Sequence, residues 1–257
     1  MKMRSFNSSE GRSMSRLREA WYIGLLDSLP LLRDPMLLIV LSLISFLPVF
    51  FLFLFQGTSA AMPALVGAVV LTLAFVGLFA AQSVYFNKNW FRFQDMLVAS
   101  PVSPISYALG LSLSTLLSSS PAIVISLIIL LVNIPIGVPA LLGVIGVTVL
   151  MWLSMVFIGF AIGATTKNTR RANSLPQILG FVLGFLPPVY YPLSLLPDWL
   201  EPVAMLVPST HAAQLAKAYF GLIAISSTDI VIGWVYLVAF TLLMAAITVR
   251  KAHWVDP

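Results

Sequence analysis

The residues best suited to specific chemistry form one polar segment, residues 87–103, which reads NKNWFRFQDMLVASPVS and separates two apolar runs. Aromatic and aliphatic side chains are interleaved there with charged and amide side chains, and Pro101 ends the pattern. A short helix over about 89–99 fits this composition. Exposed aromatic patches with a polar rim are typical of contact sites for proteins or membranes. The pattern predicts binding rather than catalysis, through these residues: Trp90, Phe91, Arg92, Phe93, Gln94, Asp95, Met96 and Leu97.

Two binding modes for this segment stay open on the residues alone. A helix that docks into a groove on a soluble partner would use the aromatic face as its anchor. A helix that lies in the membrane interface would place the same aromatic rings among the lipid headgroups.

Constellations for catalysis or metal binding are missing from the sequence. Cysteine is absent, which excludes disulfides, zinc clusters and thiol nucleophiles. His211 has no second His or carboxylate at metal-ligand spacing, so we expect it to pack and to hydrogen bond. No G-x-x-x-x-G-K-[ST] loop is present, so the chain cannot hydrolyse nucleotides by that route. We therefore expect no catalytic residue, no metal site and no cofactor on this chain.

The elements that must position these residues are membrane helices. Of the 257 residues, 60% are hydrophobic and 9% are charged, and the mean hydropathy is +1.00. A chain of this size has too little polar surface to close a water-soluble globule. We expect an all-α integral protein of the cell membrane. Because about 20 helical residues cross the hydrocarbon core, the apolar runs predict six spans, at about 36–55, 64–86, 104–132, 140–164, 174–191 and 230–249.

The net charge of +5 follows the membrane topology and does not indicate a nucleic-acid partner. Thirteen of the fourteen Lys and Arg precede span one, follow span six, or lie between spans two and three or four and five. Only Lys217 lies in the opposite loops. By the positive-inside rule, both termini and the 87–103 segment are cytoplasmic and residues 192–229 are external.

The expected spans contain no Asp, Glu, Lys, Arg or His. An ionisable group at bilayer depth costs about 2.5–3.5 kcal/mol on insertion scales and persists mainly where function requires it. No proton relay or ion-coupling carboxylate is therefore expected. If the chain performs work, the energy enters from a partner.

Residues 1–35 are expected to form a cytoplasmic tail and an amphipathic helix that precede the single membrane domain, 36–257. Apolar residues such as Leu17 and Trp21 recur at steps of three and four, while charged residues such as Arg16 and Asp27 take other faces. We expect the helix to end at Pro30 and at the Arg33-Asp34-Pro35 turn. It is either a basic membrane anchor or an elbow that passes motion into span one. The first apolar run is too long for a cleavable signal peptide.

The segment between spans five and six is divided by Pro192, Pro197, Pro202 and Pro208 into pieces too short to span. Trp199-Leu200 and Ala212–Phe220 are expected to be helical, with Ser209 or Thr210 as the N-cap of the second. The segment is either an ordinary interfacial loop or a hairpin that re-enters the membrane and packs against protein.

Polar and aromatic residues near the spans are candidates for a substrate pathway. Asn173 and Gln177 stand four apart and so share a helix face, and Ser118-Ser119-Ser120 is a small polar run. Helix packing explains the serines as well. Four aromatic residues would suit an apolar or sugar cargo, although interfacial anchoring explains them equally: Trp152, Phe185, Tyr190 and Tyr191.

Three stretches, in order along nearly the whole chain, carry a resemblance to a known family. They are RSMSRLREAWYIGLLDSLPLLRDPMLLIVL, FQDMLVASPVSPISYALG and LGFLPPVYYPLSLLPDWLEPVAMLVPSTHAAQLAKAYF. They resemble the interfacial connecting helix, the cytoplasmic segment and the external signature of type-2 ATP-binding-cassette exporter permeases.

The resemblance implies two six-span subunits, expected as a homodimer, above two cytoplasmic ATPases that bind ATP and Mg²⁺. It implies a coupling helix at about 89–99 that fits a cleft on the ATPase. Residues 192–226 would form a re-entrant hairpin. The implied connecting-helix residues are Arg16, Trp21, Arg33 and Asp34, and the implied external-gate residues are Pro192, Pro197, Trp199, Pro208, Thr210 and His211.

The chain departs from the family pattern in two places. Leu186-Pro187-Pro188 stands where relatives have a Ser-Gly pair, which is expected to kink the end of span five. Trp90-Phe91-Arg92 stands where relatives have an acidic residue followed by Gly-Thr, so the expected contact is more aromatic.

The expected function is that of an exporter permease for a hydrophobic or amphipathic substrate, such as a drug, a lipid or a glycoconjugate. The alternative is a secondary transporter or channel that works without ATP. An intramembrane enzyme acting on lipid is disfavoured, because the spans hold no convergent nucleophile, acid and base.

Overall fold

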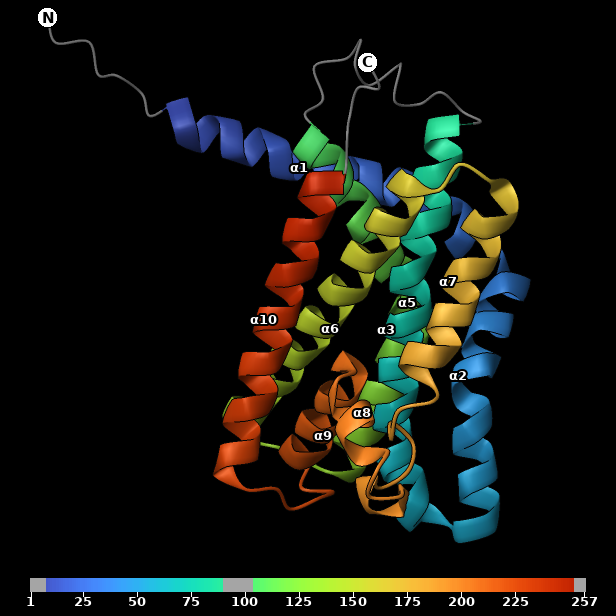
Figure 1. Ribbon diagram of the computed structural model, residues 1–257, viewed down its shortest axis with the longest axis vertical. Helices are drawn as coiled ribbons and strands as arrows, with labels where there is room; N and C mark the ends of the chain where they lie inside the picture. The colour runs from blue at the N-terminus through green and yellow to red at the C-terminus, as the bar shows by residue number, and fades with distance from the viewer. Residues whose placement is uncertain (1–7, 90–103, 252–257) are drawn as a thin grey trace, which may run out of the picture.

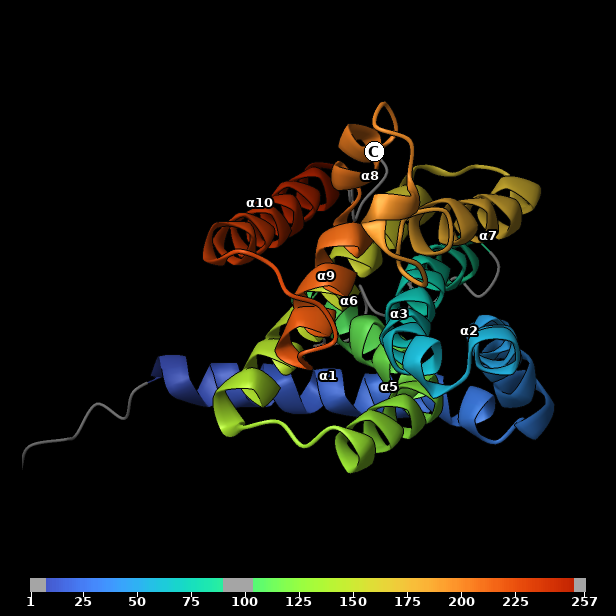
Figure 2. The same ribbon diagram turned by 90° about the horizontal axis from the view of Figure 1, so that it is seen from below.

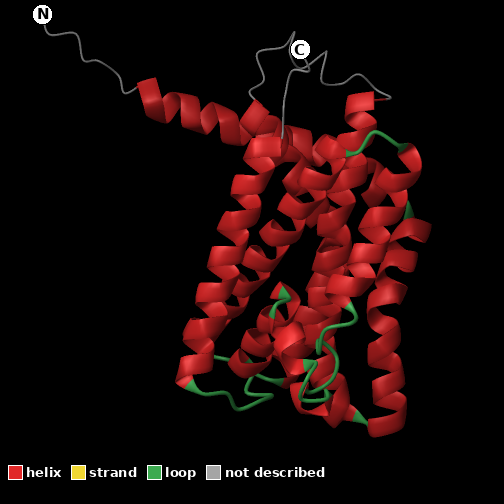
Figure 3. Cartoon of the chain, in the orientation of Figure 1, coloured by secondary structure: helices red, strands yellow, loops and turns green. Residues whose placement is uncertain are grey.

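Long apolar runs with few breaking residues fold this chain into helices. The computed structural model describes residues 8–89 and 104–251, and no strand occurs within those ranges (Figure 3). The helices, drawn in Figure 1, are α1 (Ser8–Leu32), α2 (Pro35–Gln56), α3 (Thr58–Asn89), α5 (Pro104–Asn133), α6 (Val138–Thr165), α7 (Thr169–Gly184), the short 3₁₀ helix η1 (Leu193–Leu195), α8 (Glu201–Met205), α9 (Pro208–Tyr219) and α10 (Ser227–Lys251).

Five helices of the described ranges are long and apolar enough to cross a membrane: α2, α3, α5, α6 and α10. They correspond to expected spans one to four and six. The expected fifth span, 174–191, differs, because α7 ends at Gly184. Its 16 residues extend about 24 Å, less than the roughly 30 Å of the hydrocarbon core. The prediction of a helix through Tyr191 is wrong, and a count of six spans stays a prediction.

The end of α7 follows from Leu186-Pro187-Pro188. Phe185 still donates its N–H to the carbonyl of Phe181, at 2.9 Å. Pro187 and Pro188 have no N–H to donate, and their rings clash with the preceding turn of a helix. The sequence predicted a kink at this point. Instead, the helix ends at Gly184, and the chain then turns back toward the bundle.

Helix α3 lies at the centre of the bundle and is buried over most of its length (Figure 1). It packs extensively against α6, where Gly159 and Gly163 form a G-x-x-x-G pair. A Cβ at Gly159 would lie 2.8 Å from the carbonyl oxygen of Gly77, and one at Gly163 would lie 2.6 Å from that of Ala81. Small residues at this spacing let two membrane helices approach backbone to backbone.

Helix α1 crosses one end of the bundle and packs on α5 (Figures 1 and 2). The crossing is close because Gly24 and Gly110 lack side chains. A Cβ at Gly24 would lie 3.0 Å from the Gly110 carbonyl oxygen, and one at Gly110 would lie 2.6 Å from Ile23 Cβ. The helix predicted before span one is therefore present, and it is held against the bundle.

The boundary between α1 and α2 differs slightly from the prediction. The helix continues through Pro30 to Leu32, so the prediction that it ends at Pro30 is wrong. The break at Arg33 and Asp34 is confirmed. The Asp34 carboxylate accepts the N–H of Met36 at 3.0 Å and so caps the first turn of α2.

The connections place the basic residues together. The C-terminal end of α10 and the α6–α7 connection lie at one end of the bundle with α1, which we call the basic end (Figure 1). The α2–α3 and α5–α6 connections and residues 185–226 lie at the opposite end. This separation agrees with the charge pattern. That the basic end is cytoplasmic stays a prediction.

Candidate functional site

A polar concavity with a volume of about 490 Å³ lies among α1, α2, α3, α5 and α7. We call it the polar cavity. Its polar lining consists of Asp27, Ser45, Thr72, Gln82, Ser83, Ser114, Thr115, Ser118 and Gln177. Its apolar lining consists of Val40, Ile44, Phe75, Val76, Phe79 and Phe181. Since Asp27 lies on α1 and Thr72 midway along α3, the cavity reaches from the basic end into the interior of the bundle.

Two amide side chains of the polar cavity have no hydrogen-bond partner among the described residues: Gln82 on α3 and Gln177 on α7. Each amide offers two N–H donors and one carbonyl acceptor. Amides in apolar surroundings are costly unless they are hydrogen bonded. Their full capacity is therefore available to a molecule in the cavity.

The hydroxyl groups of the cavity wall are used differently. Ser118 donates to the carbonyl of Ser114 at 2.8 Å. Thr115 donates to the carbonyl of Ser112 at 2.7 Å and accepts the indole N–H of Trp152 at 3.0 Å. The hydroxyls of Thr115 and Ser118 are therefore used within the protein, whereas the amides of Gln82 and Gln177 are open to a ligand.

Asp27 brings a carboxylate to the cavity from α1. Burial raises the pKa of the Asp27 carboxyl, and a hydrogen bond with the Ser114 side chain opposes that rise. The close crossing at Gly24 and Gly110 sets the depth of α1 and so places this carboxylate. The cavity thus combines one acid, two free amides and aromatic walls.

A second cavity, of about 320 Å³, lies at the opposite end between α2, α3 and the segment that follows α7. Tyr190 and Tyr191 line it. The Tyr190 hydroxyl donates to the carbonyl of Ser45 at 3.0 Å, and the Tyr191 hydroxyl donates to that of Leu186 at 2.6 Å. Tyr190 thus holds this segment against α2, and Tyr191 forms a hydrogen bond within the segment.

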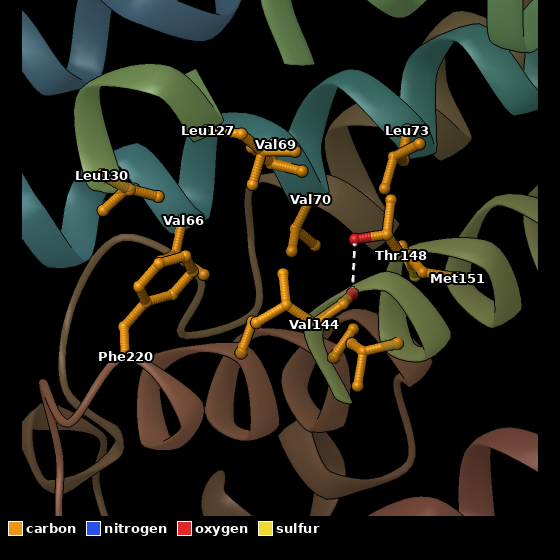
Figure 4. Close-up of a pocket in the computed structure, with 13 residues that line it drawn as sticks. Val66, Val69, Val70, Leu73, Leu127, Leu130, Val144, Thr148, Met151 and Phe220 are labelled. Carbon is orange, nitrogen blue, oxygen red and sulfur yellow. Dashed lines mark hydrogen bonds between the residues drawn. The ribbon is translucent and has the colours of Figure 1, made fainter. Parts of the chain in front are cut away.

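A small cavity between α3, α5, α6 and α9 belongs to the core (Figure 4). Its volume of about 10 Å³ is at the lower limit for a single water molecule. Apolar side chains such as Val70, Val144 and Phe220 surround it, and the Thr148 hydroxyl donates to the carbonyl of Val144 at 2.8 Å. It is a packing gap and offers no binding site.

Helix α9 closes the opposite end of the bundle by packing on α3, α6 and α10 (Figure 2). His211 hydrogen bonds through Nε2 to the carbonyl of Met205, at 2.8 Å, and stacks on the ring of Tyr236. Burial lowers the pKa of His211, and the bond to Met205 opposes this. Thr210 donates to the carbonyl of Ala204. These contacts join α9 to α8 and α10.

The sequence pattern of the ABC-2 type transporter family matches residues 27–220. This chain belongs to the ABC-2 type transporter family. It is accordingly a multi-pass membrane component of an ABC transporter, and members of this family normally work with a cytoplasmic ATP-binding-cassette ATPase. The matched range begins at Asp27 and ends at Phe220, so it includes every residue that lines the polar cavity. No curated protein matches the chain.

Within this ABC-2 domain, the predicted coupling residues Trp90 to Leu97 lie outside the described residues. Among the predicted connecting-helix residues, Arg16 lies in α1 and Trp21 exposes its side chain on the same helix. Arg33 is exposed in the break before α2, where Asp34 is the cap.

The predicted external-gate residues of the ABC-2 chain are spread over the connection between α7 and α10. Pro192 precedes η1, Pro208 opens α9, and Pro197 and the 74%-exposed Trp199 lie in the turns before α8. The expected helix at Trp199-Leu200 is instead a turn, since α8 begins at Glu201. The predicted N-cap is also wrong. Helix α9 begins at Pro208, and the side chains of Ser209 and Thr210 donate to Leu183 and Ala204 instead.

The structure separates the predicted pathway residues. Gln177 and Ser118 line the polar cavity. Asn173 lies one turn from Gln177 and does not line it, although the two share a helix face. Ser119 and Ser120 donate to the carbonyls of Leu116 and Leu117 within α5. Neither Trp152 nor Phe185 lines the polar cavity. Trp152 is buried and donates its indole N–H to Thr115, which does line it.

Sequence reasoning missed Asp27, Gln82 and Ser83 as cavity residues. The sequence pattern places Asp27 off the apolar face of the N-terminal helix, and in the structure its carboxyl meets Ser114 on α5. Gln82 and Ser83 gave a signal, because they are a polar pair inside an otherwise apolar span. An amide at bilayer depth is costly to bury, as an ionisable group is, and such polar residues persist mainly where function requires them.

Proposed function

We propose that this ABC-2 chain is the permease subunit of an ATP-driven exporter, and that it moves a hydrophobic or amphipathic substrate through the polar cavity. Two copies of the chain pair as a homodimer, and a separate cytoplasmic ATPase docks on each, at the segment 89–99. The basic end faces the cytoplasm. The observation that carries the proposal is the polar cavity, in which two amides have no partner among the described residues.

The size and lining of the cavity support an amphipathic cargo. Ligand sites commonly have volumes of about 300–1,000 Å³ and combine apolar walls with a few convergent polar groups. The polar cavity has this composition, with Phe75, Phe79 and Phe181 as aromatic wall and Gln82 and Gln177 as polar groups. A drug-sized molecule or a lipid headgroup with part of its chains fits both the volume and the chemistry.

The residues of the chain also favour an external energy source. The sequence has no phosphate loop, and its expected spans have no ionisable residue for proton or ion coupling. A secondary transporter would normally carry such a residue near its binding site. Asp27, the one carboxylate that lines the polar cavity among the described residues, lies on α1 outside the spans.

Replacing Gln177 with leucine tests the cavity as the cargo path. The substitution keeps the size of the side chain and removes its donors and acceptor. Because one hydrogen bond to a bound ligand is worth about 1 kcal/mol, transport should fall about 5-fold, and Gln82→Leu combined with Gln177→Leu should cost about 25-fold. The measurement is ATP-dependent uptake of fluorescent drug and lipid probes by inside-out vesicles that contain the permease and its ATPase.

Asn173→Leu is the matched control, since it removes an amide from the same helix, one turn outside the lining. Transport by this variant should equal that of the unchanged protein. Equal losses at residues 173 and 177, or no loss in the double variant, would remove the polar cavity from the pathway.

A further inference from the structure

Lys217 is a buried cation at the end of the bundle opposite the basic end, and no described residue forms an ion pair with it. Its side chain, on the last turn of α9, is only 5% exposed, yet it lines the second cavity. Among the described residues it has neither an ion pair nor a hydrogen bond from its ammonium group. Burial lowers the pKa of Lys217 to about 8, so the group is still mostly charged at pH 7. A buried charge is costly unless it is paired, and the described part of the chain supplies no partner for this one.

The rest of the lining favours an anion as that partner. No Asp or Glu of the described ranges lines the second cavity. The side-chain amide of Gln56 lines it and has no partner among the described residues. Tyr190 and Tyr191 already donate their hydroxyl protons to backbone carbonyls. The cavity therefore presents an ammonium and an amide, both donors, to whatever enters it.

The other wall of the second cavity is apolar. Leu52, Leu195, Leu222 and Ile223 line it. At about 320 Å³ the space is near the lower end of ligand sites. It accommodates a headgroup and the first part of a chain rather than a whole lipid. An ion alone would leave this apolar wall unused.

A tight turn fixes the lysine beside this wall. Gly221 has a positive φ of 65°, a conformation that glycine adopts without strain. The N–H of Leu222 donates to the Lys217 carbonyl, and the N–H of Gly221 donates to the Ala218 carbonyl, each at 2.9 Å. This is the Schellman arrangement, which ends a helix sharply. It brings Leu222 and Ile223 to the same cavity as Lys217.

We propose that the second cavity binds the anionic headgroup of an amphiphile, a phosphate or carboxylate that pairs with Lys217 and accepts from Gln56 while its apolar part lies along the leucine wall. This goes beyond the proposed function, because the site requires neither ATP nor an ATPase to be occupied. A lipid of the outer leaflet and a departing anionic cargo would present the same chemistry to it.

Native mass spectrometry of the purified chain, without nucleotide or ATPase, tests the site. The probes are phosphatidylglycerol, phosphatidylcholine and inorganic phosphate. We expect phosphatidylglycerol to bind more tightly than phosphatidylcholine and to resist displacement by millimolar phosphate. Because a charge-assisted hydrogen bond is worth about twice a neutral one, Lys217→Gln should weaken phosphatidylglycerol binding about 10-fold or more. Lys167→Gln, which removes an exposed cation at the basic end, should leave it unchanged.

Equal phosphatidylglycerol binding by Lys217→Gln and the unchanged chain would overturn the proposal. So would displacement by phosphate alone, which would make the ligand a free anion. Lys217→Arg keeps the charge and should retain the lipid. If the arginine variant loses as much affinity as the glutamine variant, the lysine has a structural role only. Because no ATPase is present, failure here is distinct from failure of the proposed export function.

Discussion

A chain that carries Phe93→Glu and Met96→Glu is expected to reach the membrane and to lose its ATPase. The resemblance assigns these side chains to the apolar face of a coupling helix. Central apolar anchors of an interface are each worth about 2 kcal/mol or more, and a carboxylate placed in the same groove adds an uncompensated charge. Two such changes should weaken ATPase binding by about 100-fold or more. The measurement is copurification of the ATPase with an affinity-tagged permease, together with ATP hydrolysis by the recovered complex.

Lys167→Glu serves as the control for this experiment. It also changes the charge by two, but at the exposed connection between α6 and α7. We expect that variant to retain the ATPase. If the double glutamate variant copurifies with as much ATPase as the unchanged chain, the segment 89–99 lies in the lipid interface and another surface receives the ATPase.

Adding a single methyl group at Gly163 is expected to destabilise the whole bundle. The new Cβ would lie 2.6 Å from the carbonyl oxygen of Ala81 on α3, and backbone cannot move aside as a flexible side chain can. Overpacking of a tight interior costs about 1–3 kcal/mol. We expect a loss near the upper end of that range, because α3 touches most of the other helices. Tryptophan fluorescence of the purified protein during heating measures the midpoint of unfolding.

Gly137→Ala is the comparison, since its Cβ would meet only the Pro139 ring, at 3.7 Å. Gly137 caps α6, and alanine is a poorer cap, so a loss of up to about 1 kcal/mol is expected. Unfolding midpoints that fall equally in the two variants would show that the G-x-x-x-G contact does not hold α3 to α6.

The membrane class and most helices of this protein were predictable because they depend on local composition. Apolar runs long enough to span a bilayer marked α2, α3, α5, α6 and α10. The same criterion failed at α7, where it counted Phe185–Tyr191 as helix on hydrophobicity alone. Pro187 and Pro188 end the helix before Tyr191. Their departure from the family pattern was the feature of the sequence that indicated a change at this point.

The cavities were not predictable from local patterns because they join distant parts of the chain. Asp27 and Gln177 line one space, yet 150 positions separate them. Which face of α1 meets the bundle depends on the crossing at Gly24 and Gly110, where the signal is the absence of a side chain. Lys217 was counted as an ordinary loop cation in the charge map. Its burial arises only when α9 packs among α3, α6 and α10.

The central claim, that a separate ATPase changes access to the polar cavity, can be tested with one cysteine. The chain has no cysteine of its own, so Gln177→Cys places a single thiol in the cavity lining. Ile178→Cys, on the neighbouring residue outside the lining, is the control. The measurement is the rate at which a membrane-impermeant maleimide labels each thiol from the basic end, with and without ATP and vanadate.

With the ATPase bound, we predict fast labelling of residue 177 without nucleotide and much slower labelling after ATP and vanadate, while residue 178 shows no change. Without the ATPase, nucleotide should have no effect at either position. Two results would contradict the account. One is a labelling rate at residue 177 that does not change with nucleotide in the assembled complex, and the other is an equal change when the ATPase is absent.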